Sequence, residues 1–256
     1  MFSFIFHTFF YNPLYNSLVF LIDILPGADV GLAVVILTIG VKLVLFPLSQ
    51  KALKAQASIK LAQKEIDEIK VKYADNREVL AREMLAVYKK YNINPFAGFL
   101  TLLIQIPVLF ALYFIFYKSG LPVINTSILY HFTTIPDIVN MKFLGIFDVS
   151  ARSLVAAVLV GITQAIQARY ALSKQEVPTE AGFKGDFVRG LHIQMKYVFP
   201  VMITLIAYSL ISVVSLYWIV SNLFGIGQEL YLRKKARQEG VSSKSSHVIE
   251  AEVVSK

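Results

Sequence analysis

The chain has 256 residues, of which 56% are hydrophobic and 16% are charged, and it contains no cysteine. Ordinary soluble domains are about 25% charged, so this composition predicts a membrane protein. The missing cysteines exclude disulfides, thiolate metal sites and cysteine nucleophiles, and the formal net charge of +8 does not by itself indicate nucleic acid, because cytoplasmic loops of membrane proteins collect Lys and Arg.

The N-terminal segment, residues 1–28, contains no Lys or Arg. It therefore lacks the basic region of a signal peptide, and we expect it to be retained. Within it, residues 16–25 form an apolar stretch that is short for a span. It is interrupted by Asp23 and followed by Pro26 and Gly27. This pattern favours an extracytoplasmic interfacial helix over an additional span.

Four apolar stretches follow the N-terminal segment. A membrane-spanning helix needs about 20 mostly apolar residues, and residues 29–48, 96–117 and 153–172 each meet that length. Residues 197–232 contain one charge, Glu229, which we interpret as interfacial. As one helix they would measure roughly 54 Å, too long for a hydrocarbon core of about 30 Å. We therefore expect a break near residues 209–215, with spans at 197–211 and 213–232. The predicted core, residues 29–232, is an all-α bundle of five spans.

The segment between the first two spans, residues 49–94, is charged but periodic. Apolar residues recur at three- and four-residue spacing on both sides of a break at residues 74–76: Ile59, Ala62, Ile66, Ile69 and Tyr73, then Leu80, Met84, Val87 and Tyr91. This spacing predicts a cytoplasmic antiparallel helical hairpin. The tail, residues 233–256, is basic, lacks a sustained apolar stripe and is predicted to be disordered.

The distribution of Lys and Arg sets the predicted orientation. Residues 49–94 hold ten, residues 118–152 hold three, and the tail after Leu232 holds six. Because basic loops remain in the cytoplasm, we expect the N-terminus outside, the C-terminus in the cytoplasm and the loop at 173–196 inside. Ten basic and six acidic residues leave the hairpin at only +4, so we expect no direct nucleic-acid specificity.

Lys42 lies inside the first predicted span, six residues before its end. Its ammonium could snorkel to the headgroups, or it could face a wet cavity among the helices. No acidic residue lies at comparable depth to pair with it. Neutral polar residues in the spans favour the cavity, although each alone is more typical of a hydrogen bond between helices: Thr38, Gln105, Gln164, Gln167, Ser215, Ser221 and Asn222.

The sequence indicates no catalytic chemistry. The four histidines are scattered without metal-ligand spacing, and no H-E-x-x-H motif occurs. There is no pair of intramembrane carboxylates, no G-x-S-x-G motif and no Gly-rich phosphate loop. We expect no enzyme activity, no metal site and no cofactor.

Three stretches resemble the YidC/Oxa1/Alb3 membrane protein insertases: VVILTIGVKLVLFPLSQ, YKKYNINPFAGFLTLLIQIPVLFALY and LYWIVSNLFGIGQEL. The resemblance covers residues 12–232. It implies a five-span bundle with a hydrophilic groove that is open to the cytoplasm and to lipid and closed to the outside. Nascent membrane proteins would enter this groove and pass into the bilayer. We expect a short bacterial form in the plasma membrane.

The resemblance also implies roles for individual residues. The family's groove cation falls on Lys42, where bacterial members usually have arginine, so the charge is kept but the bidentate fork is lost. We expect the substrate groove or its sliding surface to include Lys42, Thr38, Gln105, Ile106, Leu109, Gln164, Tyr217, Trp218 and Asn222. The implied partners are nascent membrane proteins and the lipid bilayer. The resemblance is also compatible with three further partners: the ribosome, the signal recognition particle pathway and the Sec translocon.

Two other functions are compatible with a charged, wet helical bundle. A small-solute or ion transporter is one, although the sequence lacks the inverted repeat and the intramembrane carboxylates typical of that class. The other is a membrane scaffold that presents the hairpin to partners. A scaffold would need the hairpin but not Lys42.

Overall fold

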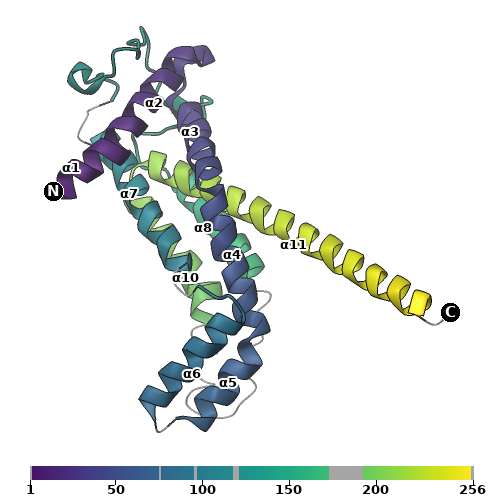
Figure 1. Ribbon diagram of the computed structural model, residues 1–256. Coiled ribbons are helices and arrows are strands. Elements are labelled where there is room, and N and C mark those ends of the chain that lie inside the picture. The colour runs from purple at the N-terminus through teal and green to yellow at the C-terminus, as the bar shows by residue number, and fades with distance from the viewer. Residues whose placement is uncertain (1, 75, 95–96, 118–120, 173–192, 255–256) are drawn as a thin grey trace.

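The computed structural model describes residues 2–74, 76–94, 97–117, 121–172 and 193–254. The fold is mostly helical, as the sequence predicted (Figure 1). The predicted cytoplasmic loop at 173–196 lies largely outside the described residues. The elements in chain order are α1 (Phe2–Phe6), η1 (His7–Tyr11), α2 (Asn12–Ile24), η2 (Pro26–Ala28), α3 (Val30–Val44), α4 (Phe46–Leu61), α5 (Gln63–Lys72), α6 (Arg77–Lys90), α7 (Ala97–Tyr117), η3 (Thr126–Ile128), β1 (Lys142–Phe143), β2 (Phe147–Asp148), α8 (Leu154–Leu172), η4 (Gln194–Val198), α10 (Phe199–Ser209) and α11 (Ser212–Val254).

Helices α2 and α3 pack against each other and form much of the main core. Pro13 stands in the first turn of α2, directly after the π-helical turn η1, and its ring holds φ near the helical value. After the turn at η2, the side chain of Asp29 caps α3 by accepting a hydrogen bond from the Leu32 N–H at 2.9 Å. Fully buried apolar side chains of both helices, among them Leu18 and Val34, then fill the space between them.

The first predicted span, residues 29–48, is not one straight helix. Helix α3 ends at Val44, and α4 begins at Phe46 with its axis bent by 58°. Pro47 explains the break, because its ring clashes with the carbonyl of Leu43 and it has no N–H to donate to it. In the part of the chain that the structure describes, this bent pair, Val30–Val44 with Phe46–Ala52, is the one combination with the length and apolar composition to cross a membrane, and no single helix meets both criteria.

Helices α5 and α6 lie side by side at the end of the molecule opposite α2 (Figure 1). Ala62, Ile66, Val87 and Ile93 form a separate buried cluster between them. The ammonium of Lys90 donates to both carboxylate oxygens of Glu65, at 3.0 and 2.9 Å. This bond holds the pKa of Glu65 below its usual value and raises the pKa of Lys90.

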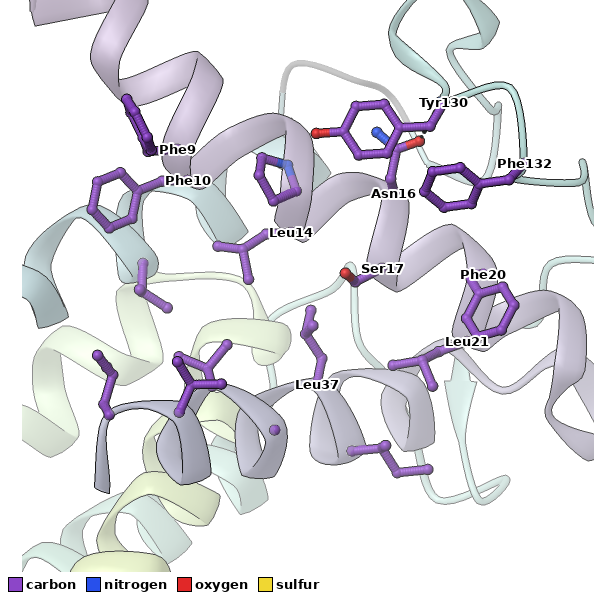
Figure 2. A pocket seen from close by; sticks show the side chains of 17 residues that line it. Phe9, Phe10, Leu14, Asn16, Ser17, Phe20, Leu21, Leu37, Tyr130 and Phe132 are labelled. Atoms are coloured by element: carbon purple, nitrogen blue, oxygen red, sulfur yellow. Dashed lines mark hydrogen bonds between the residues drawn. The ribbon is translucent and has the colours of Figure 1, made fainter. Parts of the chain in front are cut away.

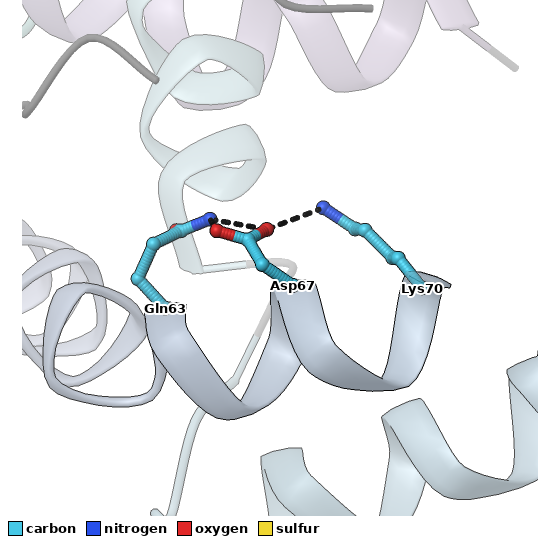
Figure 3. Close-up of polar contacts among 3 residues, drawn as sticks. All are labelled: Gln63, Asp67 and Lys70. Carbon is cyan, nitrogen blue, oxygen red and sulfur yellow. Dashed lines mark hydrogen bonds and ion pairs between the residues drawn. The ribbon is translucent and has the colours of Figure 1, made fainter. Parts of the chain in front are cut away.

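The exposed face of α5 carries its own polar contacts. Gln63 donates to both oxygens of Asp67 at 3.0 Å, and Lys70 pairs with the same carboxylate at 3.7 Å (Figure 3). Pairs at three- and four-residue spacing on an exposed helix stabilise it by only a few tenths of a kcal/mol each, about 0.2–0.5. They therefore support the local helix and do not determine the fold.

Within the described residues, the connection between α7 and α8 contains a short pair of strands, which the predicted all-α fold did not include. Strands β1 and β2 form a short antiparallel pair, with Lys142 opposite Asp148. Between them Leu144 and Gly145 have positive φ angles of 48° and 73°, which a tight turn requires. Two buried side chains hold this connection to the helices. Asn16 accepts from the Tyr130 N–H at 2.6 Å, and Asp29 accepts from the Leu144 N–H at 2.7 Å.

Helix α8 packs against both α10 and α11, and α11 also packs against α3 and α7. The break between α10 and α11 falls at residues 210–211, within the predicted interval of 209–215. No Pro or Gly makes this break. Instead, Ser212 donates from its N–H and its hydroxyl to the carbonyl of Ala151, at 2.8 and 2.6 Å, which redirects the chain.

The tail, for which the sequence predicts disorder, is part of helix α11 in the structure. Helix α11 continues beyond the predicted last span at 213–232 and ends at Val254 (Figure 1). Residues 234–239 include Lys, Ala, Arg, Gln and Glu, which favour helices, and no proline occurs after Leu232. A helix that has already formed extends at little further cost through residues 234–239.

Candidate functional site

The structure pairs Lys42 with a residue of a different helix. Lys42 stands in the last turn of α3, and its ammonium donates to the Oε1 atom of Gln105 on α7 at 2.9 Å. A snorkelling lysine would direct its ammonium along its own helix toward the headgroups. Here the ammonium is directed toward a neighbouring helix of the bundle, which favours the interior interpretation of Lys42.

A third helix completes this contact. The Nε2 atom of Gln105 donates a hydrogen bond to the hydroxyl of Tyr217 on α11. Tyr217 is only 1% exposed, whereas Lys42 and Gln105 are half-buried. One carboxamide therefore joins a cation of α3 to a phenol of α11. We call Lys42, Gln105 and Tyr217 the polar cluster.

The polar cluster leaves capacity for further hydrogen bonds. An ammonium has three N–H donors, and among the described residues Lys42 uses one of them, toward Gln105. Gln105 is neutral, so the positive charge of Lys42 has no opposite charge beside it in the described part of the chain. A carboxylate that reached Lys42 would form a charge-assisted hydrogen bond, roughly twice as strong as a neutral one.

The other predicted groove residues divide into two groups. Leu109 and Trp218 pack at the edge of the main core, and Ile106 is 48% exposed on α7. These three apolar residues are close in sequence to Gln105 and Tyr217 of the polar cluster. Trp218 also packs against the smaller core between α8 and α10, so it joins the two cores.

Thr38, Asn222 and Gln164 are not brought into the polar cluster. Thr38 is 1% exposed and donates to the carbonyl of Val34 at 2.6 Å, within its own helix. Asn222 is 4% exposed and donates to the hydroxyl of Thr163 at 3.1 Å, which ties α11 to α8. Gln164 is half-buried on α8. Thr38 and Asn222 thus make the interhelical or backbone bonds that single polar residues in spans commonly make.

Sequence reasoning missed an apolar cavity between α2 and α3. It has a volume of about 690 Å³ and lies between η1 and α2 above and α3 below (Figure 2). Tyr130 and Phe132 from the connection after α7 also line it. No local pattern signals this cavity, because it depends on the angle between α2 and α3 and on a loop more than a hundred residues away.

No metal centre is formed within the described residues, where no group of three or more His, Asp or Glu side chains could hold an ion. The polar cluster contains one cation, one amide and one phenol. It can donate hydrogen bonds to an anionic group, which is a binding property and does not require covalent chemistry.

Comparisons with known proteins place the chain among named relatives. A family model described as "60Kd inner membrane protein" matches residues 21–239. The chain is similar to a protein named membrane protein insertase YidC from Fusobacterium nucleatum subsp. nucleatum, with 29% identity over 89% of this chain and 98% of the relative. A protein of the same name from Clostridium tetani is 30% identical over 86% of this chain and 89% of the relative.

Some relatives are much longer. The protein named membrane protein insertase YidC from Oleidesulfovibrio alaskensis is 31% identical over 90% of this chain, which spans only 39% of that relative's length. The chain therefore matches nearly the whole of the shorter relatives and one part of the longer ones.

Proposed function

The chain belongs to the 60Kd inner membrane protein family, and on this basis we propose that it is a membrane protein insertase that receives nascent membrane proteins and releases their apolar segments into the bilayer. The polar cluster is the observation that carries the proposal. A half-buried cation with a neutral partner is suited to hold an acidic or polar client segment briefly. We use "client" for the membrane protein being inserted.

The client's polar end would lie beside Lys42 and Gln105, in a hydrophilic groove that opens to the cytoplasm. Its apolar segment would lie along Ile106, Leu109 and Trp218 and move from there into lipid. The proposed topology has five spans, with the N-terminus outside and the C-terminus in the cytoplasm. The bend at residue 45 supports a groove at this depth, because it turns α4 away from the direction of α3 just below Lys42.

Closure toward the outside is supported by the connection after α7. Asn16 and Asp29, both almost fully buried, fasten this connection onto α2 and α3. A fixed cover on that side would leave the cytoplasmic side as the entry route. Helices α5 and α6 would project into the cytoplasm, where their charged outer faces would meet incoming clients or the ribosome, the signal recognition particle pathway or the Sec translocon.

This mechanism needs no nucleotide. A polar segment that crosses a dry core of about 30 Å pays a large desolvation cost, and a wet groove shortens the dry path. Burial of the client's apolar helix in lipid supplies the driving force, at roughly 25 cal/mol per Å² of apolar surface. The protein only has to lower the barrier that the polar segment meets.

The proposal is tested by insertion of a short single-span client with an acidic translocated tail into liposomes that contain only this protein. Protection of the tail from external protease reports insertion. We expect protection above the level of protein-free liposomes. Equal protection in both would contradict the insertase function and would favour the transporter or scaffold alternative.

A further inference from the structure

The cavity between α2 and α3 has the composition of a lipid site. Seventeen described residues line it, and none of them is charged. Five are aromatic: Phe9, Phe10, Phe20, Tyr130 and Phe132. Water has few hydrogen-bond partners in such a space, so apolar atoms are the better occupants.

The few polar groups of the cavity lie on the α2 side. Asn16 is fully engaged, because its amide donates to Asn12 and Ile128 and its oxygen accepts from Tyr130 and Thr133. The hydroxyls of Ser17 and Tyr130 remain as polar groups of the lining (Figure 2). The site thus combines a long apolar body with neutral hydroxyls, and it offers no cation to a phosphate.

The length of the cavity distinguishes between two apolar occupants. Its lining on α3 runs from Ile36 to Leu45, which is roughly 14 Å along the helix axis. An acyl chain in one leaflet covers about half of the 30 Å hydrocarbon core, and this length matches. A client's spanning helix needs about 20 residues and the full 30 Å, so it would extend far beyond the cavity.

The cavity is also continuous with the exposed surface of the helix bundle. Phe9, Phe20, Val44 and Phe132 line it and are nevertheless 67%, 45%, 77% and 76% exposed. In a membrane protein such surface meets lipid tails. A tail can therefore enter from the side without leaving an apolar environment.

We propose that this cavity binds one acyl chain of a bilayer phospholipid, with its ester group near the hydroxyls of Ser17 and Tyr130. The site is separate from the polar cluster and goes beyond the insertase function, because its occupation needs no client. The bound chain fills the wedge between α2 and α3 and supports their packing.

Gly40 provides a direct way to fill the cavity. It lines the floor on α3, and a Cβ atom added there would meet nothing within 4 Å in the described part of the chain. Gly227 on α11 has the same open surroundings but does not line the cavity. Gly40→Leu and Gly227→Leu are therefore a matched test and control.

The experiment uses the full chain in liposomes of phosphatidylethanolamine and phosphatidylglycerol with a little phosphatidylcholine that carries a diazirine in one acyl chain. After irradiation, mass spectrometry maps the lipid adducts. We expect adducts at residues 9–21 and 36–45 in several-fold excess over the exposed apolar face of α8. Gly40→Leu should lower this excess several-fold, Gly40→Ala should lower it less, and Gly227→Leu should leave it unchanged.

Three results would overturn the lipid site. One is even labelling of all exposed apolar faces, and another is an unchanged excess in a folded Gly40→Leu protein, with folding checked by its melting curve in detergent. The third is preferential labelling of the cavity by a client that carries the diazirine in its apolar segment, with displacement of the lipid adducts, which would assign the cavity to clients. None of these results depends on whether insertion itself succeeds.

Discussion

Replacement of Gln105 by glutamate separates the stability of the polar cluster from its function. The new carboxylate would stand about where the Gln105 oxygen now accepts from Lys42 at 2.9 Å. At that distance two unit charges attract by about 6 kcal/mol with an effective dielectric constant of about 20. Removal of the carboxylate from water costs several kcal/mol, so the net change in folding free energy is small compared with either contribution.

The effect on insertion should be much larger. The internal carboxylate of Gln105→Glu occupies the ammonium that an acidic client would use. An advantage of only about 1.4 kcal/mol for the internal pair lowers client capture roughly tenfold. We therefore expect Gln105→Glu to insert an acidic-tailed client about tenfold more slowly than the wild type while it melts at a similar temperature.

The assay is the initial rate of tail protection in liposomes, measured with acidic-tailed and neutral-tailed clients that are otherwise identical. Gln105→Leu is the control without the new charge, and the neutral-tailed client controls for general damage. If Gln105→Glu and the wild type insert the acidic-tailed client equally fast, Lys42 does not contact the client's acidic groups and the reasoning is refuted.

Three further predictions concern other parts of the molecule. Asn16→Ala leaves buried backbone groups unsatisfied at about 1–3 kcal/mol each, so residues 121–149 should become more sensitive to protease; unchanged sensitivity would mean that Asn16 does not hold the cover. Cysteine at Gln105 should react with a water-soluble thiol reagent, while cysteine at Thr38, which is 1% exposed, should not; protection of both would indicate a dry bundle. The lowered pKa of Glu65 means that its bond to Lys90 stabilises the α5–α6 pair above the ordinary pKa of glutamate and that this contribution is lost as the pH falls through the lowered value. Hydrogen exchange in these helices should therefore differ between the wild type and Glu65→Gln at pH 7, and the difference should shrink as the pH falls below the ordinary pKa of glutamate; a difference that stays constant as the pH falls would contradict this role.

The spacing of apolar residues along the sequence predicted several helices of the fold. The stripes that contain Ile66 and Val87 predict two helices that bury these residues against each other, and both residues lie in the cluster between α5 and α6. The break after Ser209 was predictable from length alone. Its cause was not, because it lies in hydrogen bonds from Ser212 to Ala151, which is 61 residues away.

The candidate site was predictable in its residue types but not in its contacts. Lys42 was predicted to be a site residue because it is a lone charge within an apolar segment. Its partner, Gln105, was one of several polar residues with no local signal to rank it. Thr38 was an equally good candidate by sequence, yet its hydroxyl bonds within its own helix. The cavity beside Gly40 could not be foreseen, because it arises from the angle between two helices and from a distant loop.

The most direct test of the insertase mechanism compares the wild type with Lys42→Ala and Lys42→Arg in liposomes that contain no other protein. The measurement is insertion of the acidic-tailed single-span client. We predict that the wild type and Lys42→Arg insert it and that Lys42→Ala is strongly impaired, because only the alanine removes the positive charge beside Gln105. Equal insertion by all three proteins would contradict a role for Lys42 in receiving the client.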